Sequence, residues 1–178
     1  MRRILAVLAV LVGLGPAGAA LAAEDLSIAA FYGRWQGTGE ARRPDDIFGL
    51  TARDLDVTIR PIEGGFKVSW TTVIHPDGVT GSAEVKRKST AIDFVASGAP
   101  GVFRAPAQAD PFGGGLMWAR IKEQTLTVYA LVVDSEGAYN IQSYDRTLTG
   151  LGMELVFTRI KDDEPQRIVK GRLIRVSD

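Results

Sequence analysis

The residues able to carry out chemistry are few in this sequence, and they do not cluster. None of the 178 residues is Cys, which excludes a disulfide framework, a thiolate metal site and a cysteine nucleophile. His75 is the one His, and its neighbours Pro76-Asp77-Gly78 are typical of a turn. A His needs partner side chains to act as a general base or to hold a metal. We therefore expect His75 to be an exposed turn residue, and we expect no metal site.

Three groups of carboxylates are candidates for acid–base chemistry of the kind used on glycosidic bonds. Asp45-Asp46 and Asp162-Asp163-Glu164 fall in expected connections, and Asp54 shares one strand face with Asp56. None of these runs has the alternating oxygen ligands and the Gly bend of a calcium loop. We interpret all three groups as solvated loop or edge charges.

The remaining motifs give no enzyme signature either. No Gly-x-Ser-x-Gly elbow is present, and Gly113-Gly114-Gly115 is not followed by the Lys-Ser/Thr of a phosphate loop. Lys86-Arg87-Lys88 is interpreted as a solvated strand end, with a docking contact as the alternative. The formal net charge is zero, so nothing indicates binding to nucleic acid or to an anionic membrane surface. We expect a protein that is not an enzyme and has no cofactor, although polar groups distant in sequence could converge in the fold.

Aromatic side chains indicate a different kind of site. In a small barrel such residues either fill the interior or line an apolar pocket at the mouth, which is a favoured ligand site. The connection 97–115 is rich in Gly and Pro and is either a lid over that mouth or a mobile surface loop. The candidate ligand-binding residues are Trp70, Phe94, Phe103, Phe112, Trp118 and Tyr129.

The elements that must position these residues are predicted to be β-strands. Apolar and polar residues alternate in short runs separated by turn residues, such as Glu63-Gly64-Gly65, and no long helical period competes. This predicts an all-β protein, an antiparallel up-and-down β-barrel of roughly 8–10 strands, with a Greek-key sandwich as the alternative. A short helical turn is expected within 24–32. The expected strands are 34–41, 54–61, 66–72, 81–88, 90–96, 116–121, 124–133, 138–148, 153–160 and 166–176.

The first residues have the pattern of an export signal. Arg2-Arg3 precede an apolar run from Ile4 to Leu14, and Ala20-Leu21-Ala22 supplies the small residues of a cleavage site. The apolar run is short for the roughly 20 residues that span a membrane. We expect residues 1–22 to be a cleaved signal peptide and 23–178 to form one periplasmic domain with no membrane span.

Gly33-Arg34-Trp35 resembles the Gly-x-Trp element that opens the first strand of lipocalins and related calycin barrels. The resemblance implies a Trp that closes the blunt end of the barrel, packed beneath an Arg from a late strand. Arg172 and Arg175 are the candidates for that Arg, since a guanidinium stacks well on an indole ring.

The longer pattern Gly33-x-Trp35-x-Gly37-x-Gly39 is similar to the opening of nitrobindin-type haem barrels. Those barrels hold haem iron through a late His, and this sequence has no His after His75, so haem binding of that kind is not expected. The function we predict is non-catalytic binding or carriage of a small apolar molecule, of lipocalin-like type. The alternative is a periplasmic structural or accessory interaction domain with a filled barrel, whose protein partner is unknown.

Overall fold

The computed structural model describes residues 24–43, 46–76 and 85–177. The predicted signal peptide and the first half of the predicted strand 81–88, residues 81–84, lie outside these residues. A single 3-10 turn, η1 (Ile28–Phe31), confirms the short helical turn expected within 24–32. The strands are β1 (Gly33–Arg43), β2 (Asp46–Ile62), β3 (Gly65–His75), β4 (Lys86–Ala96), β5 (Val102–Asp110), β6 (Gly115–Lys122), β7 (Thr125–Val133), β8 (Tyr139–Thr149), β9 (Gly152–Lys161) and β10 (Glu164–Val176).

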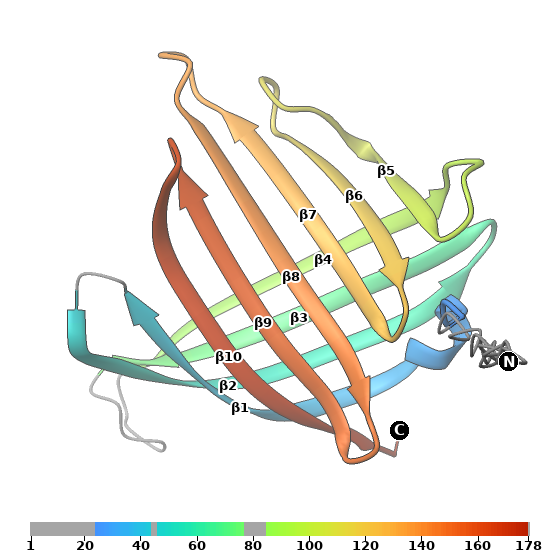
Figure 1. Cartoon of the computed structure of the whole chain (residues 1–178), viewed down its shortest axis with the longest axis horizontal. Helices are drawn as coiled ribbons and strands as arrows, with labels where there is room; N and C mark the ends of the chain where they lie inside the picture. The colour runs from blue at the N-terminus through green and yellow to red at the C-terminus, as the bar shows by residue number, and fades with distance from the viewer. Residues whose placement is uncertain (1–23, 44–45, 77–84, 178) are drawn as a thin grey trace, which may run out of the picture.

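These strands form one closed antiparallel barrel, which confirms the predicted all-β, up-and-down fold (Figure 1). Each strand pairs with its neighbours in sequence, and β1 closes the ring by pairing with β10. At the closing seam Trp35 lies opposite Arg175 of β10 on one side and opposite Val57 of β2 on the other. The five strands β6 to β10 follow the predicted ranges closely, because their apolar alternation and their turns are both clear.

The glycines of β1 allow the first and last strands to lie unusually close. A Cβ built on Gly37 would lie 1.9 Å from the carbonyl oxygen of Arg172, which no side chain tolerates. Gly39 is similarly close to Lys170, where the corresponding distance to the carbonyl oxygen is 2.7 Å. Glycine at these positions therefore removes the clash that any other residue would introduce.

A packed core fills the blunt end, where η1 and the closing seam meet. Trp35 is buried, its Nε1 donates a hydrogen bond to the Phe31 carbonyl at 3.0 Å, and the guanidinium of Arg175 lies 4.6 Å above its ring. Arg175 also donates to the Ala30 carbonyl at 3.0 Å, which ties β10 to η1. The closing pair is thus Trp35 and Arg175.

Arg172, the other candidate for closure, lies on the outside of the barrel. Its side chain is 90% exposed, with its Nε 3.9 Å from Glu154 Oε1. Residues 172 and 175 are an odd number of positions apart, so a regular strand directs their side chains to opposite faces. One of the two candidates was therefore bound to be wrong.

The region predicted as a long irregular connection, 97–115, is largely a strand. β5 occupies Val102–Asp110, with short turns before and after it, so the prediction of a 19-residue lid or surface loop is wrong. The pairing of β5 with β6 is interrupted between Arg104 and Ala109. Pro106 lies within that interruption, where its missing N–H removes no ladder bond. This proline concealed the strand pattern.

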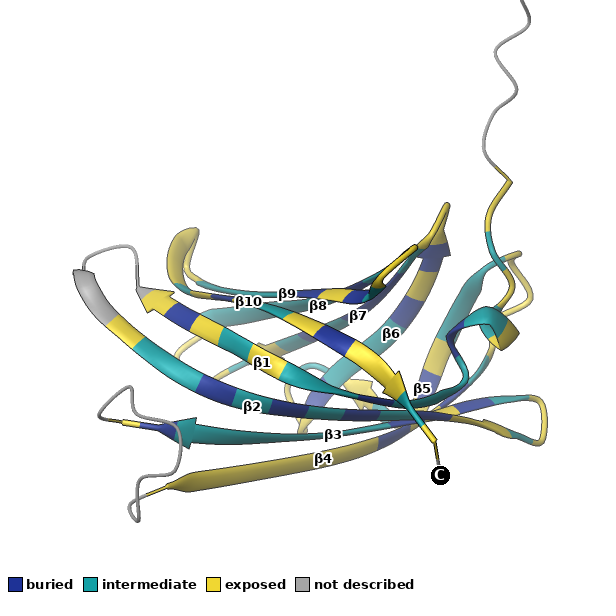
Figure 2. Cartoon of the chain, turned by 90° about the horizontal axis from the view of Figure 1, so that it is seen from below, coloured by how far each residue is buried: buried dark blue, intermediate teal, exposed yellow. Residues whose placement is uncertain are grey.

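The seam between β4 and β5 is the weakest part of the ring. Among the described residues, β4 pairs with β5 only through Val95 opposite Arg104 and Ala96 opposite Phe103. The rest of β4 pairs with β3 alone, and Lys86–Ala91 are exposed on it (Figure 2). In the part of the chain described, no helix has the length and apolar character needed to cross a membrane.

Candidate functional site: a cationic cavity inside the barrel

The end of the barrel opposite the packed core contains a cavity of about 250 Å³. The side chains around it come from strands that face one another across the interior: β2, β3 and β4 on one side and β8, β9 and β10 on the other. The principal lining residues are Arg53, Leu55, Trp70, Thr72, Ile74, Lys88, Thr90, Gln142, Tyr144, Arg146, Leu155, Phe157, Arg159, Arg167 and Val169.

Aromatic rings form one wall of this cavity. The Trp70 and Tyr144 rings lie 5.0 Å apart, and Tyr144 is followed at 4.8 Å by Phe157. Since Trp70 comes from β3 and Tyr144 from β8, their contact bridges the interior. Burial raises the pKa of Tyr144, whose hydroxyl donates to Gln142 Oε1 at 2.9 Å. The wall is thus apolar in its body, with its one hydroxyl already bonded.

Arg146 lies fully buried beside this wall. It shares the inward phase of β8 with Tyr144 and Leu148, and its guanidinium lies 5.4 Å from the Trp70 ring centroid and 5.7 Å from that of Tyr144. Nη1 donates to the Tyr144 carbonyl at 3.3 Å, whereas Nε and Nη2 are buried without a hydrogen-bond partner. Burial lowers the pKa of Arg146 to about 10, against the opposing effect of Tyr144 and Asp145. Arg146 is therefore a buried cation at neutral pH.

Four further cations surround the cavity: Arg53, Lys88, Arg159 and Arg167. The Nε atoms of Arg53 and Arg159 are also buried without a partner. Burial, and after it the charge of Arg167, lowers the pKa of Arg53. No Asp or Glu is among the lining residues in the part of the chain that the structure describes. Its interior is consequently electropositive, which attracts anions.

The sequence predicted six ligand-binding aromatics, and only Trp70 of these lines the cavity. Phe94 and Phe103 instead pack on Phe66 in the core, with ring centroids 5.2 Å and 5.0 Å from it. Phe112 is 74% exposed in the turn after β5. The core therefore takes two of the predicted pocket residues, because they lie toward the blunt end of their strands.

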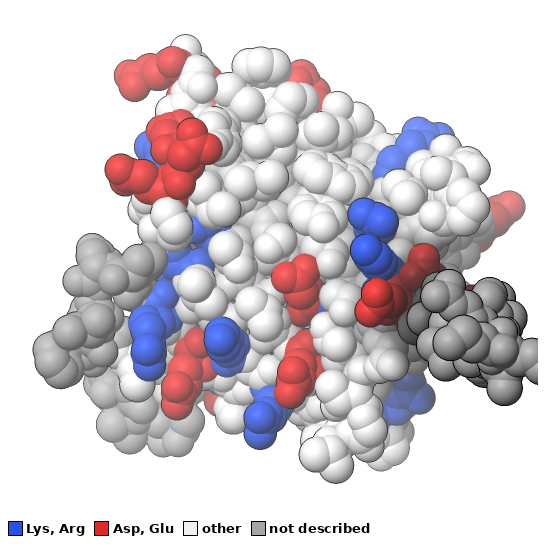
Figure 3. All heavy atoms as spheres, in the orientation of Figure 1, with Lys and Arg blue, Asp and Glu red and all other residues white. Residues whose placement is uncertain are grey.

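Trp118 and Tyr129 lie on the outer face of the barrel. Their rings stack at 4.9 Å as a cross-strand pair, while the neighbouring Ala119 and Val128 are fully buried inside. The surface over β6–β9 is mainly uncharged at its centre (Figure 3). Alternating strand positions face opposite sides, so a buried Ala119 directs Trp118 outward.

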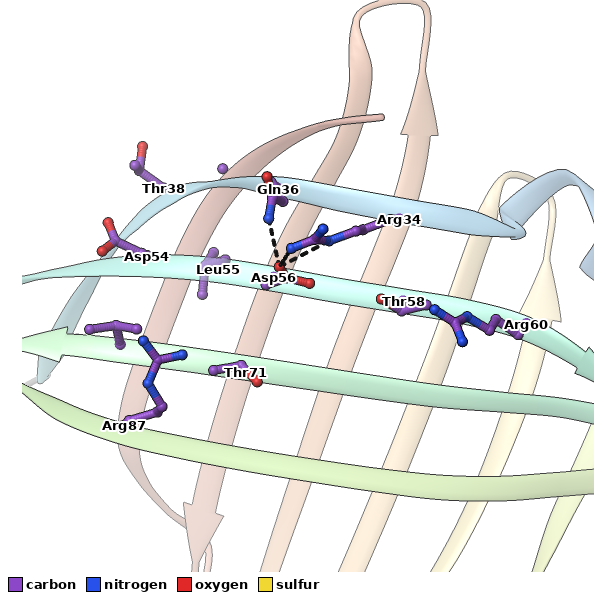
Figure 4. Close-up of a pocket in the computed structure, with 12 residues that line it drawn as sticks. Arg34, Gln36, Thr38, Asp54, Leu55, Asp56, Thr58, Arg60, Thr71 and Arg87 are labelled. Atoms are coloured by element: carbon purple, nitrogen blue, oxygen red, sulfur yellow. Dashed lines mark hydrogen bonds and ion pairs between the residues drawn. The ribbon is translucent and has the colours of Figure 1, made fainter. Parts of the chain in front are cut away.

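A broad groove of about 1110 Å³ lies on the outer face of β1–β3 (Figure 4). Both carboxylates that line it already have partners: Arg34 Nη2 and Gln36 Nε2 each lie 2.7 Å from Asp56 Oδ2, and His75 Nε2 lies 2.8 Å from Asp54 Oδ2. Burial raises the pKa of Asp56, but the hydrogen bonds from Arg34 and Gln36 and the charge of Arg34 outweigh it, so that the net pKa is lowered. A groove with its carboxylates already satisfied is a weak candidate for chemistry.

His75 is the last residue of β3 and is 3% exposed, so the expectation of an exposed turn residue is wrong. The strand extends three residues further than its clear alternation predicted. Its Nε2 lies 2.8 Å from Asp54 Oδ2 on the neighbouring strand. Within the described residues there is no group of three or more His, Cys, Asp or Glu that could hold a metal ion.

The four arginines of the cavity were missed by the sequence reasoning, although a signal was present. Arg53 precedes Leu55 by two positions, Arg146 follows Tyr144 by two, and Arg167 precedes Val169 by two. Each arginine therefore shares the inward phase of an apolar neighbour. A cation in phase with the core on several strands indicates a charged interior.

Comparison with known proteins identifies no family for the chain. No protein-family model and no curated protein matches it. A solved structure that resembles it is the S-type phycobiliprotein lyase CPES from Guillardia theta, with a TM-score of 0.40 and 11% sequence identity. The match covers 86% of this chain and 94% of the lyase chain.

Proposed function

We propose that this protein binds or carries a small, largely apolar molecule inside the barrel, without catalysing a reaction on it. The observation that carries the proposal is the interior cavity of about 250 Å³ with its aromatic wall. The packed core lies at the other end, around Phe31, Trp35 and Phe66. Leu55 and Leu155 belong both to that core and to the cavity lining, so the cavity begins where the core ends.

The size of the cavity limits the ligand. Ligand sites commonly measure about 300–1,000 Å³, and this cavity is slightly below that range. Barrel mouths are favoured positions for such sites, since the wall is rigid and one end is open. A compact ligand, such as a medium-length alkyl chain or a two-ring aromatic molecule, fits these dimensions.

The second candidate is a structural or accessory interaction domain with a filled barrel. The cavity favours the binding function over it, because a filled barrel would leave no interior space of about 250 Å³. For either function we retain the periplasm as the proposed location, on the pattern of residues 1–22.

The chain offers a matched pair of tryptophans for the test. Trp70 lines the cavity, whereas Trp118 lies on the outer face. We expect the uncharged fluorophore N-phenyl-1-naphthylamine to bind with one equivalent and with enhanced emission. Trp70→Ala should weaken that binding about tenfold or more, and Trp118→Ala should leave it within about twofold, since one large aromatic contact is worth about 1.5–3 kcal/mol.

Native mass spectrometry of protein purified from its own source should in addition show a co-purifying small molecule. An empty protein that binds neither the fluorophore nor any of the alkyl probes named below would overturn the proposed function. Equal loss of binding in Trp70→Ala and Trp118→Ala would do the same, because the bound probe would then lie outside the barrel.

A further inference from the structure

We infer that the ligand is an amphipathic organic anion, whose carboxylate or phosphate head is held by Arg146 and whose apolar tail lies along the aromatic wall. This inference rests on the proposed function and specifies the chemical class of its ligand. It is carried by the unsatisfied arginine nitrogens of the cavity, which neither the fold nor the core explains.

Four buried nitrogens that line the cavity have no hydrogen-bond partner: Nε and Nη2 of Arg146, Nε of Arg53 and Nε of Arg159. Buried polar groups are nearly always bonded, and an unsatisfied one costs about 1–3 kcal/mol, more when it is charged. Three arginines with this defect in one cavity indicate acceptors that arrive from outside the chain. An anionic head group supplies such acceptors.

The geometry of Arg146 matches a particular kind of head group. Nε and Nη2 lie on the same edge of the planar guanidinium, and that edge binds two oxygens of one carboxylate or phosphate side by side. The third nitrogen, Nη1, is already bonded to the Tyr144 carbonyl. The contacts of the Arg146 guanidinium with the Trp70 and Tyr144 rings hold it in place before the ligand binds.

The balance of charge selects against other ligands. Among the described residues, five cations and no carboxylate line the cavity, and the charge of Arg167 contributes to the lowered pKa of Arg53. A cationic ligand would add to this repulsion, and an uncharged one would leave it in place. The apolar groups beside the arginines, Trp70, Leu155 and Phe157, then accommodate an alkyl or aromatic tail.

The test compares three probes with one tail: decanoate, decyl phosphate and 1-decanol, titrated into the full chain by calorimetry. We expect at least one anion to bind tenfold or more tightly than decanol, with one equivalent bound. The tighter of the two anions identifies the head group as carboxylate or phosphate. The preference should persist at 0.5 M salt, since buried charge pairs are screened only weakly.

Variants then locate the head group. Arg146→Met should reduce the preference for the anion over decanol about tenfold or more, while decanol itself still binds. Arg159→Gln, which removes a second unsatisfied nitrogen, should reduce the preference about threefold and remains informative if Arg146→Met does not fold. Arg172→Gln, on the outer surface, is the matched control and should leave the preference unchanged.

The outcomes separate the two proposals. If decanol binds as tightly as both anions, or if the preference survives in Arg146→Met and Arg159→Gln, the anion inference is overturned and the binding function stands. A preference that disappears at 0.5 M salt overturns it as well, because exposed basic residues would then explain it. If none of the three probes binds, the anion inference is overturned, and the binding function falls with it when N-phenyl-1-naphthylamine does not bind either.

Discussion

Replacing Arg146 with Met should stabilise the protein in the absence of ligand. Burial lowers the pKa of this arginine from its usual value, more than two units higher, to about 10. Each tenfold change in a protonation constant is worth about 1.4 kcal/mol, so the buried charge costs the folded state about 3 kcal/mol. The contacts with the Trp70 and Tyr144 rings recover about 1–2 kcal/mol of this. Met is flexible and apolar and fills irregular spaces well. Replacing a buried charge by an apolar residue of similar volume often stabilises the folded state.

The expected net gain is therefore about 1–2 kcal/mol in the free energy of unfolding. For a domain of this size that raises the melting temperature by about 2–8 °C. Urea unfolding of ligand-free wild type and variant at pH 8, followed by circular dichroism, measures the difference. A loss of more than about 1 kcal/mol, with the β-sheet spectrum unchanged, would refute the reasoning, because Arg146 would then stabilise the empty barrel.

The pH dependence of this gain provides a second check, and its sign follows from the lowered pKa. Below about pH 10 Arg146 is charged in both the folded and the unfolded chain, so its whole cost is present. Between about pH 10 and the higher pKa of an ordinary arginine, the unfolded chain binds more protons than the folded one, so the stability of the wild type rises relative to the variant. The advantage of Arg146→Met should consequently be smaller at pH 11 than at pH 8. An advantage that grows with pH would contradict the assignment.

Three further predictions test the frame around the cavity. Trp35→Ala should destabilise the protein by about 3–5 kcal/mol in urea unfolding, the usual cost of deleting a large buried aromatic, and a change below about 1 kcal/mol would mean that Trp35 does not close the barrel. Gly37→Ala should cost more than about 3 kcal/mol or prevent folding, since its Cβ would meet the Arg172 carbonyl, whereas Gly150→Ala, with no atom within 4 Å, should be close to neutral. In native-state hydrogen exchange, alternate amides over Lys86–Phe94 of β4 should exchange much faster than the amides of β7, because β7 has partner strands on both sides. Uniform protection along β4 would instead show that the seam with β5 is closed.

Most of the fold could be predicted from the sequence, because it depends on local alternation and on turns. The strands β6 to β10 end within two residues of the expected ranges. β5 could not be recognised, since Pro106 and the flanking glycines interrupt its pattern. On β6 and β7 it was harder still to predict from the sequence which side chains face the interior. Both faces of these strands are apolar, as Leu116 and Trp118 outside and Met117 inside illustrate, so periodicity alone does not determine which face is the core.

The site could have been found by asking which polar residues share the phase of the core, rather than which polar residues lie close together in sequence. Arg53, Arg146 and Arg167 are more than 20 residues from one another and come from β2, β8 and β10. Each one, taken alone, resembles an ordinary strand residue with a solvated head. A closed barrel changes this, because every inward position of every strand faces the same enclosed space. Charges of one sign at such positions repel one another and lose their hydration, so they persist only where something outside the chain compensates them. This is why an inward-phase cation on several strands is a stronger sign of an anionic ligand than any local basic cluster, such as Lys86-Arg87-Lys88 at the exposed start of β4.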